Sequence, residues 1–132
     1  MKFKIIILSL VSMITSLVYS QVDKKDTYKT SNGTLTIQPI LHSSMIISYN
    51  GKTIYVDPYG GENLYKNQPA PDIILITDIH GDHLNIDTLE KIDTSNALFI
   101  VPEAVFEMLP GEFKGKAEIL NNYYSTKSRF GL

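Results

Sequence analysis

The segment that decides most of the predicted fold and function is Thr77-Asp78-Ile79-His80-Gly81-Asp82-His83-Leu84-Asn85. It follows directly on the apolar run Ile73-Ile74-Leu75-Ile76 and holds two of the three histidines in the chain. Four side chains of metal-ligand type fall within six positions: Asp78, His80, Asp82 and His83. Imidazoles and carboxylates gathered at the end of a buried strand are unfavourable unless a cation or a hydrogen-bond network compensates them. The segment therefore predicts a metal site.

The spacing of these residues indicates how they would share metal ions. Residues two apart in an extended segment project to the same side, so Asp78 and His80 can reach one cation together. We expect Gly81 to let the backbone turn sharply, so that Asp82 and His83 face a second cation or a supporting position. Nitrogen and oxygen donors of this kind suit Zn, Mn, Fe or Ni. The alternative is that Asp82 only caps the next helix; the density of ligand-type residues favours the metal site.

Apolar and alternating runs on both sides of the segment predict a mixed sheet. Asn50-Gly51 is the strongest hairpin signal in the chain. The continuous apolar run at 72–77 is typical of a strand buried on both faces. Further strands are expected at 34–40, 44–49, 52–57, 97–101 and 116–120, and helices at 86–92 and 103–109. This order predicts an α/β fold with α+β layering, in which a mixed sheet starts antiparallel and continues in βαβ units.

Composition limits the classes of protein and partner. The chain has 132 residues, 43% hydrophobic and 20% charged, as expected for one globular domain. A net charge of −2 without a Lys/Arg cluster gives no reason to expect a nucleic-acid partner. We expect the partner to be a small-molecule substrate. The absence of cysteine excludes disulfides and thiolate zinc sites, so any metal must be held by nitrogen and oxygen.

The first twenty residues have the pattern of a secretory signal peptide. A basic start at 1–4 precedes an apolar run at 5–18, and Val18 and Ser20 occupy the small-residue positions before Gln21. A membrane anchor is the alternative, but the run is shorter than the roughly 20 residues that a spanning helix needs. We expect an exported protein, periplasmic or secreted, with no stable membrane anchor after cleavage. Residues 21–33 are expected to form a flexible lead-in to a domain at 34–132.

The ligand-rich segment resembles the His-x-His-x-Asp-His motif of the metallo-β-lactamase-fold hydrolases. It is most similar to the branch that contains the L-ascorbate-6-phosphate lactonase. The segments 39–44, 50–59 and 70–77 resemble other parts of that branch, so the resemblance covers about 35–101. It implies an αββα sandwich that binds two divalent metal ions and uses metal-activated water to attack a lactone, amide or phosphoester.

The resemblance also implies roles for individual residues. His80 corresponds to a ligand of the first metal site, and Asp82 and His83 to ligands of the second. Asp82 is also the candidate catalytic residue, positioning the nucleophile or protonating the leaving group. Asp78 stands where a first histidine is expected. A carboxylate there would shift the preference from Zn towards Mn or Fe.

Two further residues have open roles. The resemblance places His42 near the mouth of the site, as a supporting or substrate contact; a hydrogen-bonded histidine in a turn is the alternative. Asp57 either orients the ligand loop, as carboxylates often do for ligating histidines, or only closes the turn before Pro58. For Asp57 the turn role is the preferred interpretation.

The ligand set is incomplete by the standard of the family. No histidine follows His83, and four ligands would give each of two ions only two protein ligands. We therefore expect the sequence to be the N-terminal half of a longer exported metal-dependent hydrolase, with the sandwich truncated to its first half. A short protein that completes its site by dimerisation is an alternative for the chain. A non-catalytic metal-binding or degenerate relative is the alternative for the function.

Overall fold

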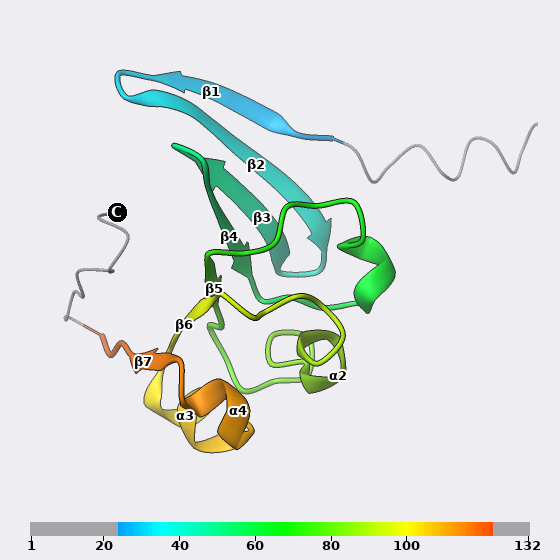
Figure 1. The fold of residues 1–132 in the computed structure, drawn as a ribbon, viewed down its shortest axis with the longest axis vertical. Helices are drawn as coiled ribbons and strands as arrows, with labels where there is room; N and C mark the ends of the chain where they lie inside the picture. Colours follow the sequence, from blue (N-terminus) through cyan, green and yellow to red (C-terminus); the bar gives the residue numbers. More distant parts are fainter. Residues whose placement is uncertain (1–23, 123–132) are drawn as a thin grey trace, which may run out of the picture.

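The computed structural model describes residues 24–122, so the predicted signal peptide at 1–20 lies outside the described residues (Figure 1). One sheet of seven strands contains, in chain order, β1 (Asp26–Thr30), β2 (Gly33–Leu41), β3 (Ser44–Tyr49), β4 (Lys52–Val56), β5 (Ile73–Leu75), β6 (Leu98–Val101) and β7 (Ala117–Ile119). The helices are short: η2 (Glu62–Leu64), α2 (Ile86–Leu89), α3 (Glu103–Met108) and α4 (Gly111–Lys114).

The sheet changes direction halfway along its width, as predicted. Strands β1 to β4 pair antiparallel, whereas β4–β5, β5–β6 and β6–β7 pair parallel. The turn between β3 and β4 is the predicted hairpin: Asn50 (φ 50°) and Gly51 (φ 73°) both have left-handed backbone, which a two-residue type I′ turn requires. The mixed-sheet prediction is thus confirmed.

The expected flexible lead-in at 21–33 is wrong for residues 26–30, which form β1. All five residues of β1 are exposed, so no burial pattern marks the strand. Its order comes from backbone pairing with β2 across the turn at Ser31 and Asn32. The Thr30 hydroxyl reinforces that turn by donating to the Gly33 carbonyl at 2.8 Å.

Other predicted boundaries need smaller corrections. The strand expected at 72–77 is paired only over 73–75, and the helix expected at 86–92 ends as a regular helix at Leu89. The helix expected at 103–109 is α3, which ends at Met108, and a further helix, α4, begins at Gly111 without a signal in the sequence. Gly81 lies in the expected sharp turn, in which the His80 carbonyl accepts from the backbone N–H groups of His83 and Leu84. Its φ is not left-handed, and a Cβ placed there would meet nothing within 4 Å.

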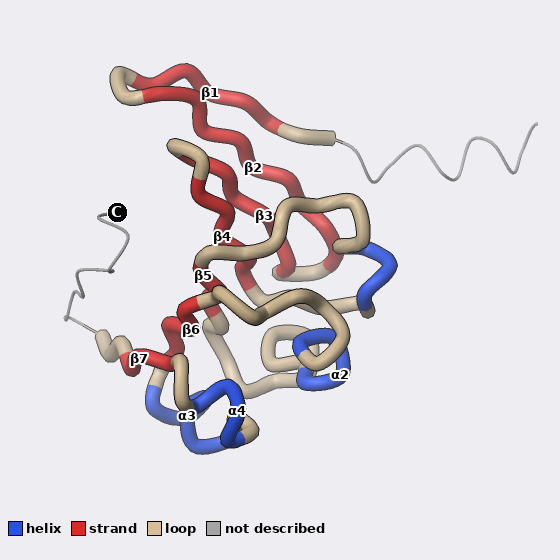
Figure 2. Tube along the Cα trace, in the orientation of Figure 1, coloured by secondary structure: helices blue, strands red, loops and turns tan. Residues whose placement is uncertain are grey.

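The core lies between the sheet and its helices, of which α2, α3 and α4 gather around the parallel half (Figure 2). One row of paired residues crosses the sheet on this face: Gln38, Ile46, Tyr55, Ile74, Phe99 and Ala117. Buried side chains from the helices and the segments beside them cover it, among them Leu89, Val105, Leu109 and Phe113. Burying this apolar surface is the main stabilising term for the fold.

The opposite face of the sheet is also apolar. Met45, Val56, Leu75 and Ile100 are paired in one row there and are partly buried. Apolar side chains on both faces are expected of parallel strands in a layered fold. Within residues 24–122, no helix is long and apolar enough to cross a bilayer.

Candidate metal centre

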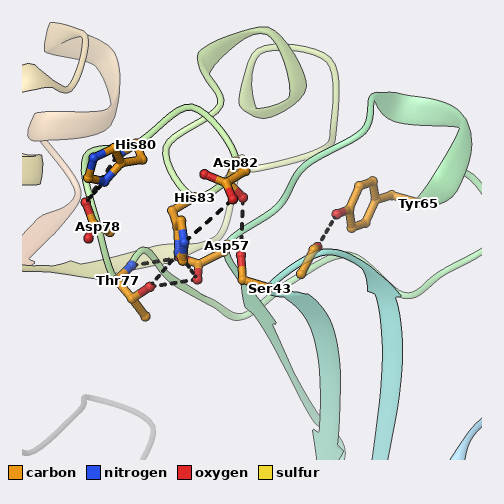
Figure 3. A network of polar contacts seen from close by, with 9 residues as sticks. Ser43, Asp57, Tyr65, Thr77, Asp78, His80, Asp82 and His83 are labelled. Carbon is orange, nitrogen blue, oxygen red and sulfur yellow. Dashed lines mark hydrogen bonds and ion pairs between the residues drawn. The ribbon is translucent and has the colours of Figure 1, made fainter.

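The ligand-rich loop and Asp57 meet at one edge of the sheet. Asp57 follows β4 directly, and Thr77 to His83 follow β5, which is the parallel neighbour of β4. Because the carboxyl ends of parallel neighbours lie at the same edge, residues 20 to 26 positions apart come into contact (Figure 3). This edge is where folds of this class place their sites.

Asp57 is the buried anchor of the loop, with only 2% of its surface exposed. Its Oδ1 accepts a hydrogen bond from the Thr77 backbone N–H at 2.8 Å. Its Oδ2 accepts from the Thr77 hydroxyl at 2.7 Å and lies 2.9 Å from His83 Nδ1. Asp57 therefore orients the loop as well as ending β4, and the preferred interpretation of a turn residue alone is wrong.

The contact with Asp57 fixes the orientation of His83. The hydrogen bond that the His83 ring donates to the Asp57 carboxylate is the main cause that raises the pKa of His83, and the charges of Asp57, Asp82 and Asp78 add to it. With Nδ1 engaged by the carboxylate, Nε2 is the nitrogen left for a ligand. That Nε2 lies 3.9 Å from Asp82 Oδ2. Two ligands that each stand about 2.1 Å from one ion are at most about 4.2 Å apart, and about 3.4 Å apart in tetrahedral geometry. This pair is therefore within the limit for a shared cation and must approach slightly to hold one.

Asp78 and His80 form a second, more exposed pair. They lie on the same side of the chain, as their spacing predicts, with Asp78 Oδ1 2.7 Å from His80 Nδ1. This hydrogen bond, with a second from the His80 backbone N–H, lowers the pKa of Asp78. The carboxylate thus holds the ring by Nδ1 and leaves Nε2 for a ligand. A direct bond from Asp78 to a metal stays a prediction.

The four candidate ligands lie in these two pairs and do not form one cluster. Within residues 24–122, no three side chains of His, Asp or Glu converge closely enough to hold a metal ion. The assignment of two protein ligands to each of two ions stays a prediction.

The turn between β2 and β3 lies against the loop. The Ser43 hydroxyl donates to the Asp82 carbonyl at 3.2 Å. His42 is exposed, and its ring meets the edge of the Tyr59 ring at 5.3 Å between centroids. The predicted place of His42 beside the site is therefore compatible with the geometry, and its role stays a prediction. No sequence signal pointed to Ser43 as a contact of the loop.

A cavity of about 390 Å³ lies elsewhere, between the segment after β4 and the segment after α2. Tyr55 and Tyr65 line it together with Glu62, Asn63, Lys66, Gln68, Ala70, Pro71, Lys91, Ile92 and Asp93. None of the four candidate ligands is among these residues. The candidate ligands thus lie on an exposed loop at the strand ends, separate from this cavity.

Comparisons with known proteins agree with the geometry. The family model described as "Beta-lactamase superfamily domain" matches residues 36–127. A metal-dependent hydrolase of the UPF0173 group from Lysinibacillus sphaericus is 45% identical over 65 residues, which cover 46% of this chain and 28% of that protein. The corresponding protein from a Geobacillus strain is 42% identical over the same length.

Two solved structures have the same fold. The crystal structure of a candidate metal-dependent hydrolase from Parabacteroides distasonis is 34% identical with a TM-score of 0.68, over 81% of this chain and 47% of that one. A metallo hydrolase from the archaeon Ignicoccus hospitalis aligns with a TM-score of 0.54 at 23% identity, over 66% of this chain and 40% of that one.

The matched segment spans less than half the length of each of these relatives. The family model nevertheless covers most of the chain, including the whole ligand-rich loop and the strands that deliver it. The chain therefore belongs to the β-lactamase superfamily, and to its metallo-β-lactamase-fold branch of metal-dependent hydrolases.

Proposed function

We propose that this chain provides part of the active site of a metal-dependent hydrolase, with Asp82 and His83 holding one divalent cation. The observation that carries the proposal is the geometry of His83. Its Nδ1 is held by the buried Asp57 carboxylate, and its Nε2 lies 3.9 Å from Asp82 Oδ2. The names of the relatives support a divalent metal, since the UPF0173 proteins are described as metal-dependent hydrolases.

The proposed substrate is a small molecule with a lactone, amide or phosphoester bond. When bound, a divalent ion supplies Lewis acidity and makes water a nucleophile near neutral pH. Asp57 keeps the proton of His83 on Nδ1, so that Nε2 presents a lone pair. The exposed Asp82 carboxylate can orient the attacking water and pass its proton to the leaving group. His80, with its ring held by Asp78, would serve a second ion, which could be Zn, Mn or Fe.

The test combines metal content with hydrolysis. Purified protein is supplied with Zn²⁺, Mn²⁺ or Fe²⁺, bound metal is counted by mass spectrometry, and a phosphodiester, a lactone and an anilide are offered as substrates. Asp82→Asn and His83→Ala should lower both metal content and hydrolysis. Asp87→Asn is the matched control, because Asp87 is an exposed acid in the first turn of α2. Protein that holds no metal under any of these conditions would refute the proposal.

A second candidate is a metal-binding relative without hydrolytic activity. The observation that favours it is Asp78, which occupies the place of a first histidine and bonds to His80 at 2.7 Å. Stoichiometric metal without turnover of any substrate would support this candidate. Turnover that Asp82→Asn abolishes would exclude it.

We include export to the periplasm or medium in the proposal. The basic start and apolar run of residues 1–20 support it. N-terminal sequencing of the protein recovered outside the cytoplasmic membrane should begin near Gln21. A protein that retains Met1 at its N-terminus would refute cleavage.

A further inference from the structure

Tyr65 is a buried residue whose hydroxyl group makes three polar contacts, two with Tyr59 and one with Ser44. Its side chain belongs to the core and only 5% of the residue is exposed. The hydroxyl accepts from the Tyr59 backbone N–H at 2.9 Å and donates to the Tyr59 carbonyl at 3.0 Å. The hydroxyl of Ser44, a buried residue, lies 2.6 Å away.

These contacts fill the hydrogen-bonding capacity of the Tyr65 hydroxyl. A phenol has one proton to donate and two lone pairs that can accept. The proton goes to the Tyr59 carbonyl, so the Tyr59 N–H and the Ser44 hydroxyl must both donate to Tyr65. A phenylalanine at this position would leave both donors without their partner in a buried environment, which is unfavourable.

Tyr59, the first partner of Tyr65, is close in the chain to Asp57, the buried residue that anchors the loop. Tyr59 is two residues after Asp57, with the rigid Pro58 between them. Asp57 has a left-handed backbone, with φ of 44°, which is unfavourable for a residue with a side chain unless its surroundings hold it. By fixing both backbone groups of Tyr59, Tyr65 holds the segment from which Asp57 reaches Thr77 and His83.

Ser44, the second partner of Tyr65, is adjacent to Ser43, which contacts the loop at Asp82. Ser44 begins β3, and the adjacent Ser43 donates to the Asp82 carbonyl at 3.2 Å. The bond between Tyr65 and Ser44 therefore fixes the turn that contacts the backbone of Asp82. Both routes start at one hydroxyl group, and they end at the two residues of the proposed shared cation, His83 and Asp82.

We infer that Tyr65 is a positioning residue for the metal loop, acting through Tyr59 and Asp57 on His83 and through Ser44 and Ser43 on Asp82. It touches neither candidate ligand itself. The effect on metal binding rests on the proposed function, whereas the effect on the order of the loop does not. The inference assigns a role to a tyrosine that the ligand motif does not include.

The experiment measures the order of the loop by amide hydrogen exchange of the full chain. Tyr65→Phe removes the shared hydroxyl, and Ser43→Ala removes only the final contact to Asp82. Tyr55→Phe is the matched control, because Tyr55 is equally buried but donates to Pro69, away from the loop. We expect roughly fivefold faster exchange over 77–85 in Tyr65→Phe and a smaller increase in Ser43→Ala. Tyr55→Phe should leave exchange over 77–85 unchanged.

Zinc affinity, measured by competition with a chromophoric chelator, is the second readout. Supporting groups around a ligand set typically change affinity 10-fold or more, so Tyr65→Phe should weaken Zn²⁺ binding by about 10-fold. Exchange over 77–85 that matches Tyr55→Phe, or an increase spread evenly over the sheet, would overturn the inference. If Tyr65→Phe does not fold, Ser43→Ala decides: faster exchange at 82–84 supports the inference and none overturns it. Wild-type protein that binds no Zn²⁺ would instead count against the proposed function, and the exchange data would still decide the inference.

Discussion

Replacing Asp57 by Asn should separate the stability of the sheet edge from its ability to bind metal. The carboxylate accepts three hydrogen bonds, two from Thr77 and one from His83, and only 2% of Asp57 is exposed. An amide can still accept from the Thr77 N–H and donate to the Thr77 hydroxyl. It also tolerates the left-handed backbone of this position. What it loses is the acceptor that faces His83 Nδ1.

The expected loss of stability follows from the type of bond. Bonds to a charged acceptor contribute about 1.5–3 kcal/mol each and neutral ones about 1 kcal/mol. Asp57→Asn weakens three such bonds but no longer buries a charge, so the net loss should be about 2 kcal/mol. Asp57→Ala removes all three bonds, and alanine is less favourable than Asp or Asn in left-handed backbone, for a total of roughly 4 kcal/mol. Urea unfolding followed by circular dichroism measures both values.

The expected loss of metal affinity follows from the proton on His83. An amide that donates to Nδ1 favours the tautomer with its proton on Nε2, and that nitrogen cannot then bind a metal. Zn²⁺ affinity should fall about 10- to 100-fold, the usual effect of removing such a supporting carboxylate. Chelator competition measures it at a temperature where both proteins are folded.

Asp72 provides the matched control at the other end of the same two strands. It precedes β5, accepts from the Thr53 backbone N–H at 2.8 Å and pairs with Lys52 at 2.9 Å. Asp72→Asn should lower the unfolding free energy by about 1 kcal/mol and leave Zn²⁺ affinity unchanged. If Asp57→Asn binds Zn²⁺ within twofold of the wild type, or if Asp57→Ala is no less stable than Asp72→Asn, the assigned role of Asp57 is refuted.

Three further predictions concern the loops and the pH dependence. Gly60→Ala should lower the unfolding free energy by about 2 kcal/mol or more, because Gly60 has φ of +92° and an added Cβ would stand 2.6 Å from Leu64 Cδ1 and 2.9 Å from Leu41 Cδ2. The control Gly81→Ala, where an added Cβ meets open space, should change the unfolding free energy by no more than about 0.5 kcal/mol. Equal effects of the two substitutions in urea unfolding would contradict the argument. Asn85→Ala should lower it by about 1 kcal/mol, since the Asn85 side chain caps α2 by accepting from the Thr88 N–H and hydroxyl, and an unchanged urea midpoint would count against this cap. The Thr53 N–H and then Lys52 hold the pKa of Asp72 below its ordinary 3.8, so the carboxylate stabilises the fold above that pH and this contribution is lost as the pH falls through the lowered folded-state pKa. Below about pH 4, the unfolding free energy should therefore fall more steeply in the wild type than in Asp72→Asn, and parallel pH profiles would refute it.

Local signals explain which parts of the fold the sequence predicts well. The hairpin between β3 and β4 follows from Asn50-Gly51, because the conformation of a two-residue turn depends on those two residues. Strands β5 and β6 are marked by continuous apolar runs, because both of their faces are covered by apolar neighbours. Strand β1 had no such mark, since all its residues are exposed and its order depends on β2. The dipeptide Asn32-Gly33, similar to the pair in the predicted hairpin, was the available signal.

The candidate site is likewise predictable from the sequence only in part. Its ligand-type residues stand in one loop, so their chemistry and spacing are visible in the sequence. The contacts that hold them come from three other segments, through side chains that look ordinary in the sequence. Nothing in composition or periodicity distinguishes Tyr65 from Tyr49 or Tyr59, because its role depends on the tertiary position of Ser44.

Asp57 is the intermediate case, and it shows what sequence reasoning could add. Its contact with His83 spans 26 positions, but it follows from the strand order once β4 and β5 are known to be parallel neighbours. Two strand ends at one edge place the residue after each strand in reach of the loop after the other. We therefore expect an acidic residue at the end of one strand to hold a ligating histidine when the parallel neighbour of that strand ends in histidines. The preference for a turn residue failed because it considered only the proline that follows Asp57 and left out the strand beside it.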